Sequence, residues 1–187
     1  MKATYRSPAI FLFTLSVLSS LAWSQNTPLE QPKITETKET VLPGSLTAIL
    51  SNSATFTTLT KALKTAELDL TLGSQGEFTI FAPSDEAFAK LPTALLTKLM
   101  LPENKGKLRS LLLYHVIADK VLTSELKNGD LKTMNGERVL LKIDSDKVEI
   151  GDAKVFNANL STNNGIIHSI GKVLVPKSLN DFFALDK

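Results

Sequence analysis

The sequence predicts an α+β fold, in which helices come mainly before residue 129 and β-hairpins after it. Apolar residues recur at helical spacing through much of the first part, whereas apolar and polar residues alternate in the second. Turn-forming asparagine–glycine pairs mark the second part at Asn128-Gly129, Asn135-Gly136 and Asn164-Gly165. Helices and strands that occupy separate parts of a chain favour α+β architecture over a βαβ repeat.

The elements of the first part follow from periodicity and from breaking residues. They are expected as a short helix at 46–50, a helix within 54–68, a strand at 78–82, and helices at 93–100 and 105–116. Gly73 and Gly76 interrupt the pattern before the strand. Pro83 then ends the strand, and Ser84 or Asp85 supplies an oxygen that can cap the helix burying Phe88.

The second part reads as strands that alternate between apolar and polar residues. They are expected at 139–143, 147–150, 153–156 and 166–170. Within the last of these, His168 shares a face with Ile166 and Ile170, which predicts a buried and hydrogen-bonded histidine. His115 likewise shares a helical face with apolar residues, whereas Tyr114 points elsewhere.

The N-terminus predicts export. Residues 1–24 combine a basic start, an apolar run and small residues before Gln25, which is typical of a cleaved signal peptide. The apolar run is too short for a spanning helix, so no membrane span is expected after cleavage. Residues 25–42 are polar and predict a flexible spacer, and residues 43–187 a single domain, expected to be a secreted monomer in the periplasm, at the cell surface or in the medium.

Composition and motifs exclude several classes of function. The chain has no cysteine, no nucleophile motif and no metal-ligand spacing, so neither enzyme activity nor a metal or other cofactor is expected. Without residues 1–24, 19 basic residues balance 19 acidic ones, because Lys2 and Arg6 are removed. No basic stripe remains, and nucleic acid is therefore not an expected partner.

Three segments together resemble the fasciclin (FAS1) domain family: a first box at 79–88, a Tyr–His segment at 111–116 and a second box at 164–176. The resemblance implies a β-wedge of about seven strands with helices packed on one side. It also implies structural roles for a set of motif residues: Thr79, Phe81, Ala82, Pro83, Asp85, Phe88, Asn164, Gly165, His168, Ile170 and Pro176. The second box departs from the family at Gly171, where relatives usually carry an acid.

In animal members the Tyr–His segment is linked to integrin-dependent adhesion. Carried over to this chain, the resemblance implies partner contact by Tyr114 and His115 with their neighbours Leu112, Leu113, Val116 and Ile117. The alternative for the same residues is a purely structural role in the core.

The expected function is therefore a secreted or cell-surface module for adhesion or matrix interaction, which recognises a protein or glycan without covalent chemistry. A second possibility is a carrier of an apolar small molecule, such as a carotenoid-type pigment or a lipid, because some relatives bind such pigments. The apolar stretch 95–122 would then provide the site, unless its leucines simply fill the core.

Overall fold

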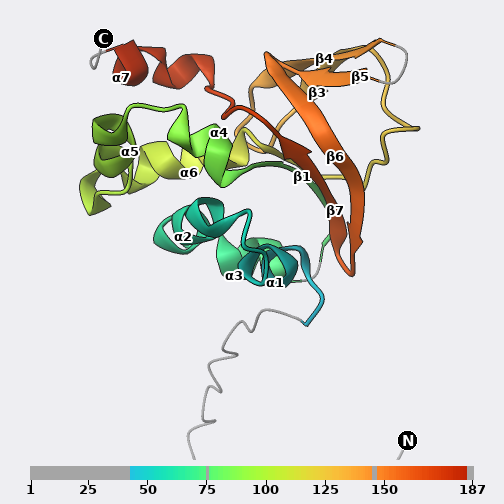
Figure 1. Cartoon of the computed structure of the whole chain (residues 1–187), viewed down its shortest axis with the longest axis horizontal. Coiled ribbons are helices and arrows are strands. Elements are labelled where there is room, and N and C mark those ends of the chain that lie inside the picture. Colours follow the sequence, from blue (N-terminus) through green and yellow to red (C-terminus); the bar gives the residue numbers. More distant parts are fainter. Residues whose placement is uncertain (1–42, 75, 145–146, 185–187) are drawn as a thin grey trace, which may run out of the picture. The chain divides into compact units, whose positions relative to one another are not determined.

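The computed structural model describes residues 43–74, 76–144 and 147–184 (Figure 1). The expected signal peptide (1–24) and spacer (25–42) lie outside these ranges. The helices are α1 (Leu46–Ser51), α2 (Thr57–Thr65), α3 (Asp69–Gly73), α4 (Asp85–Ala89), α5 (Thr93–Leu99), α6 (Lys105–Leu113) and α7 (Asn180–Ala184), with short 3₁₀ turns at Pro102–Asn104 and Lys177–Leu179. The strands are β1 (Phe78–Pro83), β2 (Val116–Ile117), β3 (Gly129–Lys132), β4 (Arg138–Asp144), β5 (Lys147–Ile150), β6 (Ala153–Thr162) and β7 (Gly165–Ile170).

The strands form one mixed sheet in the order β2-β1-β7-β6-β5-β4-β3. Its centre is the parallel pair β1–β7, which aligns Phe78–Pro83 with Gly165–Ile170, and every other neighbouring pair is antiparallel. The two boxes of the sequence therefore contain the two central strands, which lie side by side in Figure 1.

Alternation along the central strands divides the interior into two cores. Ile80, Ala82 and Ile167 point to one face and pack with the apolar stripes of the helices. Phe81 and Ile170 point to the other face, where they pack against apolar residues of β4 and β5. The expected α+β architecture of seven strands with helices on one side is thus confirmed.

Several element boundaries differ from expectation. The helix predicted over 105–116 ends at Leu113, because His115 N–H bonds to the carbonyl of Leu112 and the chain then turns to pair as β2 with β1. Strands β2 and β3 and helices α3 and α7 were not predicted. The two helices have five residues each and the two strands have two and four, so a hydrophobic period is only weakly defined in them.

The predicted turn at Asn164-Gly165 is also displaced by one residue. The turn lies at positions 163–164, and Gly165 is already the first residue of β7. Glycine is required there by close approach, since a Cβ at this position would lie 2.1 Å from the carbonyl oxygen of Phe78 on β1.

Candidate functional site

The Tyr–His segment lies where α6 ends and β2 begins. Tyr114 is the C-terminal cap residue of α6, and its side chain enters the second core with 8% of its surface exposed. The hydroxyl donates to the carbonyl oxygen of Arg138 at 3.2 Å. Burial, together with the charges of Glu137 and Asp152, raises the pKa of Tyr114 above its ordinary value, so the phenol remains a neutral donor.

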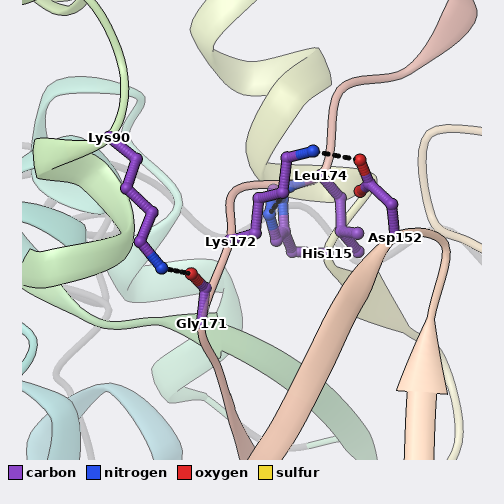
Figure 2. Close-up of polar contacts among 6 residues, drawn as sticks. All are labelled: Lys90, His115, Asp152, Gly171, Lys172 and Leu174. Carbon is purple, nitrogen blue, oxygen red and sulfur yellow. Dashed lines mark hydrogen bonds and ion pairs between the residues drawn. The ribbon is translucent and has the colours of Figure 1, made fainter.

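His115 fastens the end of α6 to the chain that follows β7 (Figure 2). Its side chain is 1% exposed. Nδ1–H donates to the carbonyl of Leu111 at 2.8 Å, and Nε2 accepts from the N–H of Leu174 at 2.9 Å. Burial lowers the pKa of His115 to about 4, although the bond to Leu111 opposes this shift. The imidazole is therefore neutral at pH 7, with a tautomer that both partners require.

The other residues of the predicted contact set are also largely internal. Leu112, Val116 and Ile117 are buried, and Leu113 is partly exposed. This burial favours the structural alternative for the segment. A direct contact with a partner through Tyr114 stays a prediction.

His168 is the second buried histidine, and it lies beside Phe81 of the second core. It is fully buried and stacks on Phe81, with ring centroids 5.3 Å apart. Nδ1 accepts from the N–H of Asn159 at 3.2 Å, and Nε2–H donates to the carbonyl of Val121 at 3.1 Å. Burial lowers the pKa of His168, against the effect of the bond to Val121. The two histidines are thus separate structural groups with different partners.

The first box supplies two helix caps instead of the single one expected. Ser84 caps α4, because its hydroxyl accepts from the N–H of Ala87. Asp85 caps α2, a helix nearly thirty residues earlier in the chain. Its carboxylate accepts from the N–H and hydroxyl of Thr57 and from the N–H of Thr58, at 2.7–3.1 Å. Partial burial works against ionisation, but these hydrogen bonds prevail and lower the pKa of Asp85.

The second box holds α1 and the loop after α3 against the central strands. Asn164 Oδ1 accepts from the N–H of Leu46 at 2.7 Å, and Nδ2 donates to the carbonyls of Leu72 and Ser74. The remaining motif residues form a buried set: Thr79, Phe81, Ala82, Pro83, Phe88, Gly165, Ile170 and Pro176.

Two lysines make polar contacts at the segment immediately after β7, one from outside it and one within it (Figure 2). Lys90 donates to the carbonyl of Gly171 at 2.7 Å, and Lys172 forms an exposed ion pair with Asp152. A Cβ at Gly171 would meet nothing within 4 Å. The position therefore has room for the side chain that the family resemblance leads one to expect there.

The surface of the described residues includes a strongly exposed aromatic side chain and several hollows. Phe156 on β6 is 60% exposed, the highest value among the large apolar residues described. It lines a hollow of about 300 Å³, here called the Phe156 hollow, together with residues 54–55 and 84–86. A helix groove of about 430 Å³ lies between α2 and α5, and a gap of about 670 Å³ between β2 and the β3–β4 turn. Sequence reasoning missed Phe156, because an alternating strand pattern does not reveal which face stays uncovered.

Two negative findings hold within the described ranges. No helix there has both the length and the apolar character needed to cross a bilayer. Nor does that part of the chain bring three or more histidine, aspartate or glutamate side chains together as a set of metal ligands.

Comparisons with known proteins agree with the motifs. The fasciclin domain matches residues 54–176. Protein sll1483 of Synechocystis sp. is 37% identical over 132 residues, which cover 71% of this chain and 73% of that protein. Human periostin is 32% identical over 123 residues, which cover 65% of this chain but 14% of periostin.

The fold also matches a solved structure, a FAS1 domain pair from the insect cell adhesion molecule fasciclin I. The TM-score is 0.64 at 18% identity, over 73% of this chain and 52% of that one, which shows likeness of fold alone. Fasciclin-domain proteins are adhesion and secreted proteins without enzymatic activity, as expected from the absence of catalytic motifs in this sequence. The chain belongs to the fasciclin (FAS1) domain family.

Proposed function

We propose that this chain is an exported recognition module that binds a protein or glycan at a cell surface or in a matrix by non-covalent contact. The observation that carries the proposal is the exposed ring of Phe156 beside its hollow. Interface hot spots combine an aromatic side chain, a concavity and a polar rim, and here Asp85 and Glu86 supply the rim. The family membership and the export signal predicted for residues 1–24 support the same function.

The chemistry of the rim supports contact and not catalysis. Asp85 is occupied as the cap of α2, so its charge is fixed in place and its oxygens are already hydrogen-bonded. Glu86 is exposed and has no partner among the described residues. A partner side chain that covers Phe156 can therefore meet a carboxylate without breaking a bond within the domain.

A matched pair of variants tests this proposal. Phe156→Ser removes the exposed ring, and Leu140→Ser removes the next most exposed of the large apolar side chains described (43%), on β4. Binding of the labelled full chain to intact cells and matrix of its source should fall at least about tenfold in the first variant, the size of a hot-spot loss, and persist in the second. Equal binding by both variants would overturn the role of Phe156, and absence of binding by the unmodified chain would overturn the function.

A carrier function is a second candidate, and the helix groove between α2 and α5 supports it. Leu96 and Met100 line this groove with three threonines and Lys61. Other leucines of the stretch 95–122, such as Leu95 and Leu108, belong to the core and offer no surface to a ligand. Retention of a carotenoid by the purified chain, seen as pigment absorbance and reduced in a Met100→Glu variant, is the expected result for a carrier. An unloaded chain after incubation with the pigment counts against it.

A further inference from the structure

The two outer strands of the sheet approach each other at one end. Strand β2 pairs only with β1, and β3 pairs only with β4, so each presents an edge without a strand partner. One main-chain hydrogen bond joins these edges, from the N–H of Met134 to the carbonyl of Val116 at 2.8 Å. Beyond that bond the edges separate, and the gap of about 670 Å³ opens between residues 117–119 and 132–134. This space is called the edge gap below.

The ladder pattern shows which main-chain groups face the edge gap. The N–H of Thr133 donates to the carbonyl of Glu137, so the main-chain groups of Thr133 point toward β4. Because main-chain groups alternate in direction along an antiparallel strand, those of Asp130 and Lys132 point the opposite way, as Met134 does.

The same rule applies on the facing strand. The carbonyl of His115 accepts from Phe81 N–H, and Ile117 is aligned with Thr79, so both face β1. Val116 therefore faces outward, and Ala118 lies in the bend that follows β2. Of these two, Val116 uses its carbonyl for Met134, and no hydrogen bond is found for the main chain of Ala118 in the described part of the protein.

Apolar side chains lie at the base of the edge gap, and the charged residues Asp119 and Lys132 also line it. Ile117 and Met134 lie where the edges meet. Asp130 and Lys132 are two positions apart on β3, so their side chains share one face, and both are exposed. An extended peptide that pairs with β3 thus meets one acidic and one basic side chain at a spacing of two residues.

We propose that the edge gap binds an extended segment of a partner protein, which adds a strand between β3 and β2. The outward main-chain groups of Asp130 and Lys132, with those of Ala118 across the gap, suit another strand, and the charges on β3 select its side chains. In the antiparallel direction to β3, the segment carries a carboxylate opposite Lys132, an apolar residue next and a cation opposite Asp130. The inference rests on the proposed recognition function in taking a protein as the ligand, but it uses a different surface from the Phe156 hollow.

The probe is the capped pentapeptide acetyl-Thr-Glu-Val-Lys-Thr-amide, titrated into the ¹⁵N-labelled full chain and followed by backbone amide NMR. The amides of Ala118, Asp130 and Lys132 should shift together. N-methylation of the Glu and Lys residues of the peptide removes the donors that face β3, and should weaken binding about tenfold. A peptide with Glu and Lys exchanged tests the charge register and should also bind more weakly.

Two variants separate the main chain from the side chain at the same position. Lys132→Pro removes the side chain and the outward N–H without removing a ladder bond, whereas Lys132→Ala removes the charged side chain and keeps the N–H. Binding should be at least about threefold weaker in the proline variant than in the alanine variant, as for one lost hydrogen bond. The N-methylated peptide provides the same test with the unmodified protein, whether or not the proline variant folds.

The results that would refute strand addition in the edge gap differ from those that would refute the proposed recognition function. Unshifted amides at Asp130 and Lys132, or equal affinity of the N-methylated peptide, refute strand addition at this place. Shifts that gather instead around Phe156 also refute it, while leaving recognition by the Phe156 hollow intact.

Discussion

Replacement of His115 by leucine should destabilise the domain severely, although leucine fits an apolar site. The substitution leaves two internal polar groups without their partner, the N–H of Leu174 and the carbonyl of Leu111. Each such group costs about 1–3 kcal/mol, which gives a loss of about 2–6 kcal/mol in the free energy of unfolding. That is a large share of the roughly 5–15 kcal/mol available to a whole domain.

Urea denaturation followed by circular dichroism at pH 7 measures this loss. At a slope of about 1–3 kcal/mol per molar urea, the midpoint should fall by at least about 0.7 M. Lys172→Ala is the matched control, because it removes an exposed ion pair on the same segment that His115 fastens. Its effect should stay below about 1 kcal/mol.

His115 also makes the free energy of unfolding depend on pH, and the direction follows from its lowered pKa. Its pKa is about 4 in the folded chain and about 6.5 when unfolded, so the unfolded state binds the proton first as pH falls. Stability is therefore fully present above pH 6.5 and is lost progressively between pH 6.5 and 4. From pH 7 to pH 5 the loss from His115 alone is about 2 kcal/mol.

His115→Leu removes this contribution, so its unfolding free energy should vary less with pH over that range. His168 stays in both proteins and contributes equally to each. Two results would refute the reasoning. One is a change of less than about 0.5 kcal/mol at pH 7, and the other is an unchanged dependence on pH between 7 and 5.

Three further predictions concern the boxes, each checked by urea denaturation. Gly165→Ala places a methyl group against the carbonyl of Phe78 and should cost about 3 kcal/mol or more; a loss under 1 kcal/mol contradicts the close approach. Asp85→Ala removes the cap of α2 and should cost about 1–2 kcal/mol at pH 7. Because hydrogen bonding lowers the pKa of Asp85, this difference should shrink as pH falls through that lowered pKa, and a constant difference argues against the cap. Gly171→Ala meets open space and should stabilise the chain by about 0.4–1 kcal/mol through loss of entropy in the unfolded state, whereas destabilisation would show that the position is constrained.

The central strands and most helices could be predicted from the sequence because their signals are local. The strand before Pro83 and the cap at Ser84 depend on neighbouring residues, and both were found where expected. Asp85 shows the limit of such reasoning. Its position also suits a cap for α4, and only the packing of α2 beside it shows that its carboxylate binds Thr57 and Thr58.

The candidate site was harder to predict, because exposure is a property of the assembled domain. Helical spacing placed Tyr114 away from the apolar face of His115, but α6 ends before that spacing applies. The phenol enters a second core built by strands far along the chain. Phe156 differs from Tyr114 in the opposite direction. An aromatic residue in a strand is usually buried, and this one is exposed.

The central pairing of β1 with β7 has a consequence for the order of events during synthesis. The partner of Ile80 is Ile167, so nearly the whole domain must be made before the middle of the sheet can close. Such long-range pairing is slow to form compared with local helices and hairpins. Until then β1 has no partner on its β7 side and the centre of the sheet stays open, and an incompletely folded polypeptide can still cross a membrane before it folds on the far side.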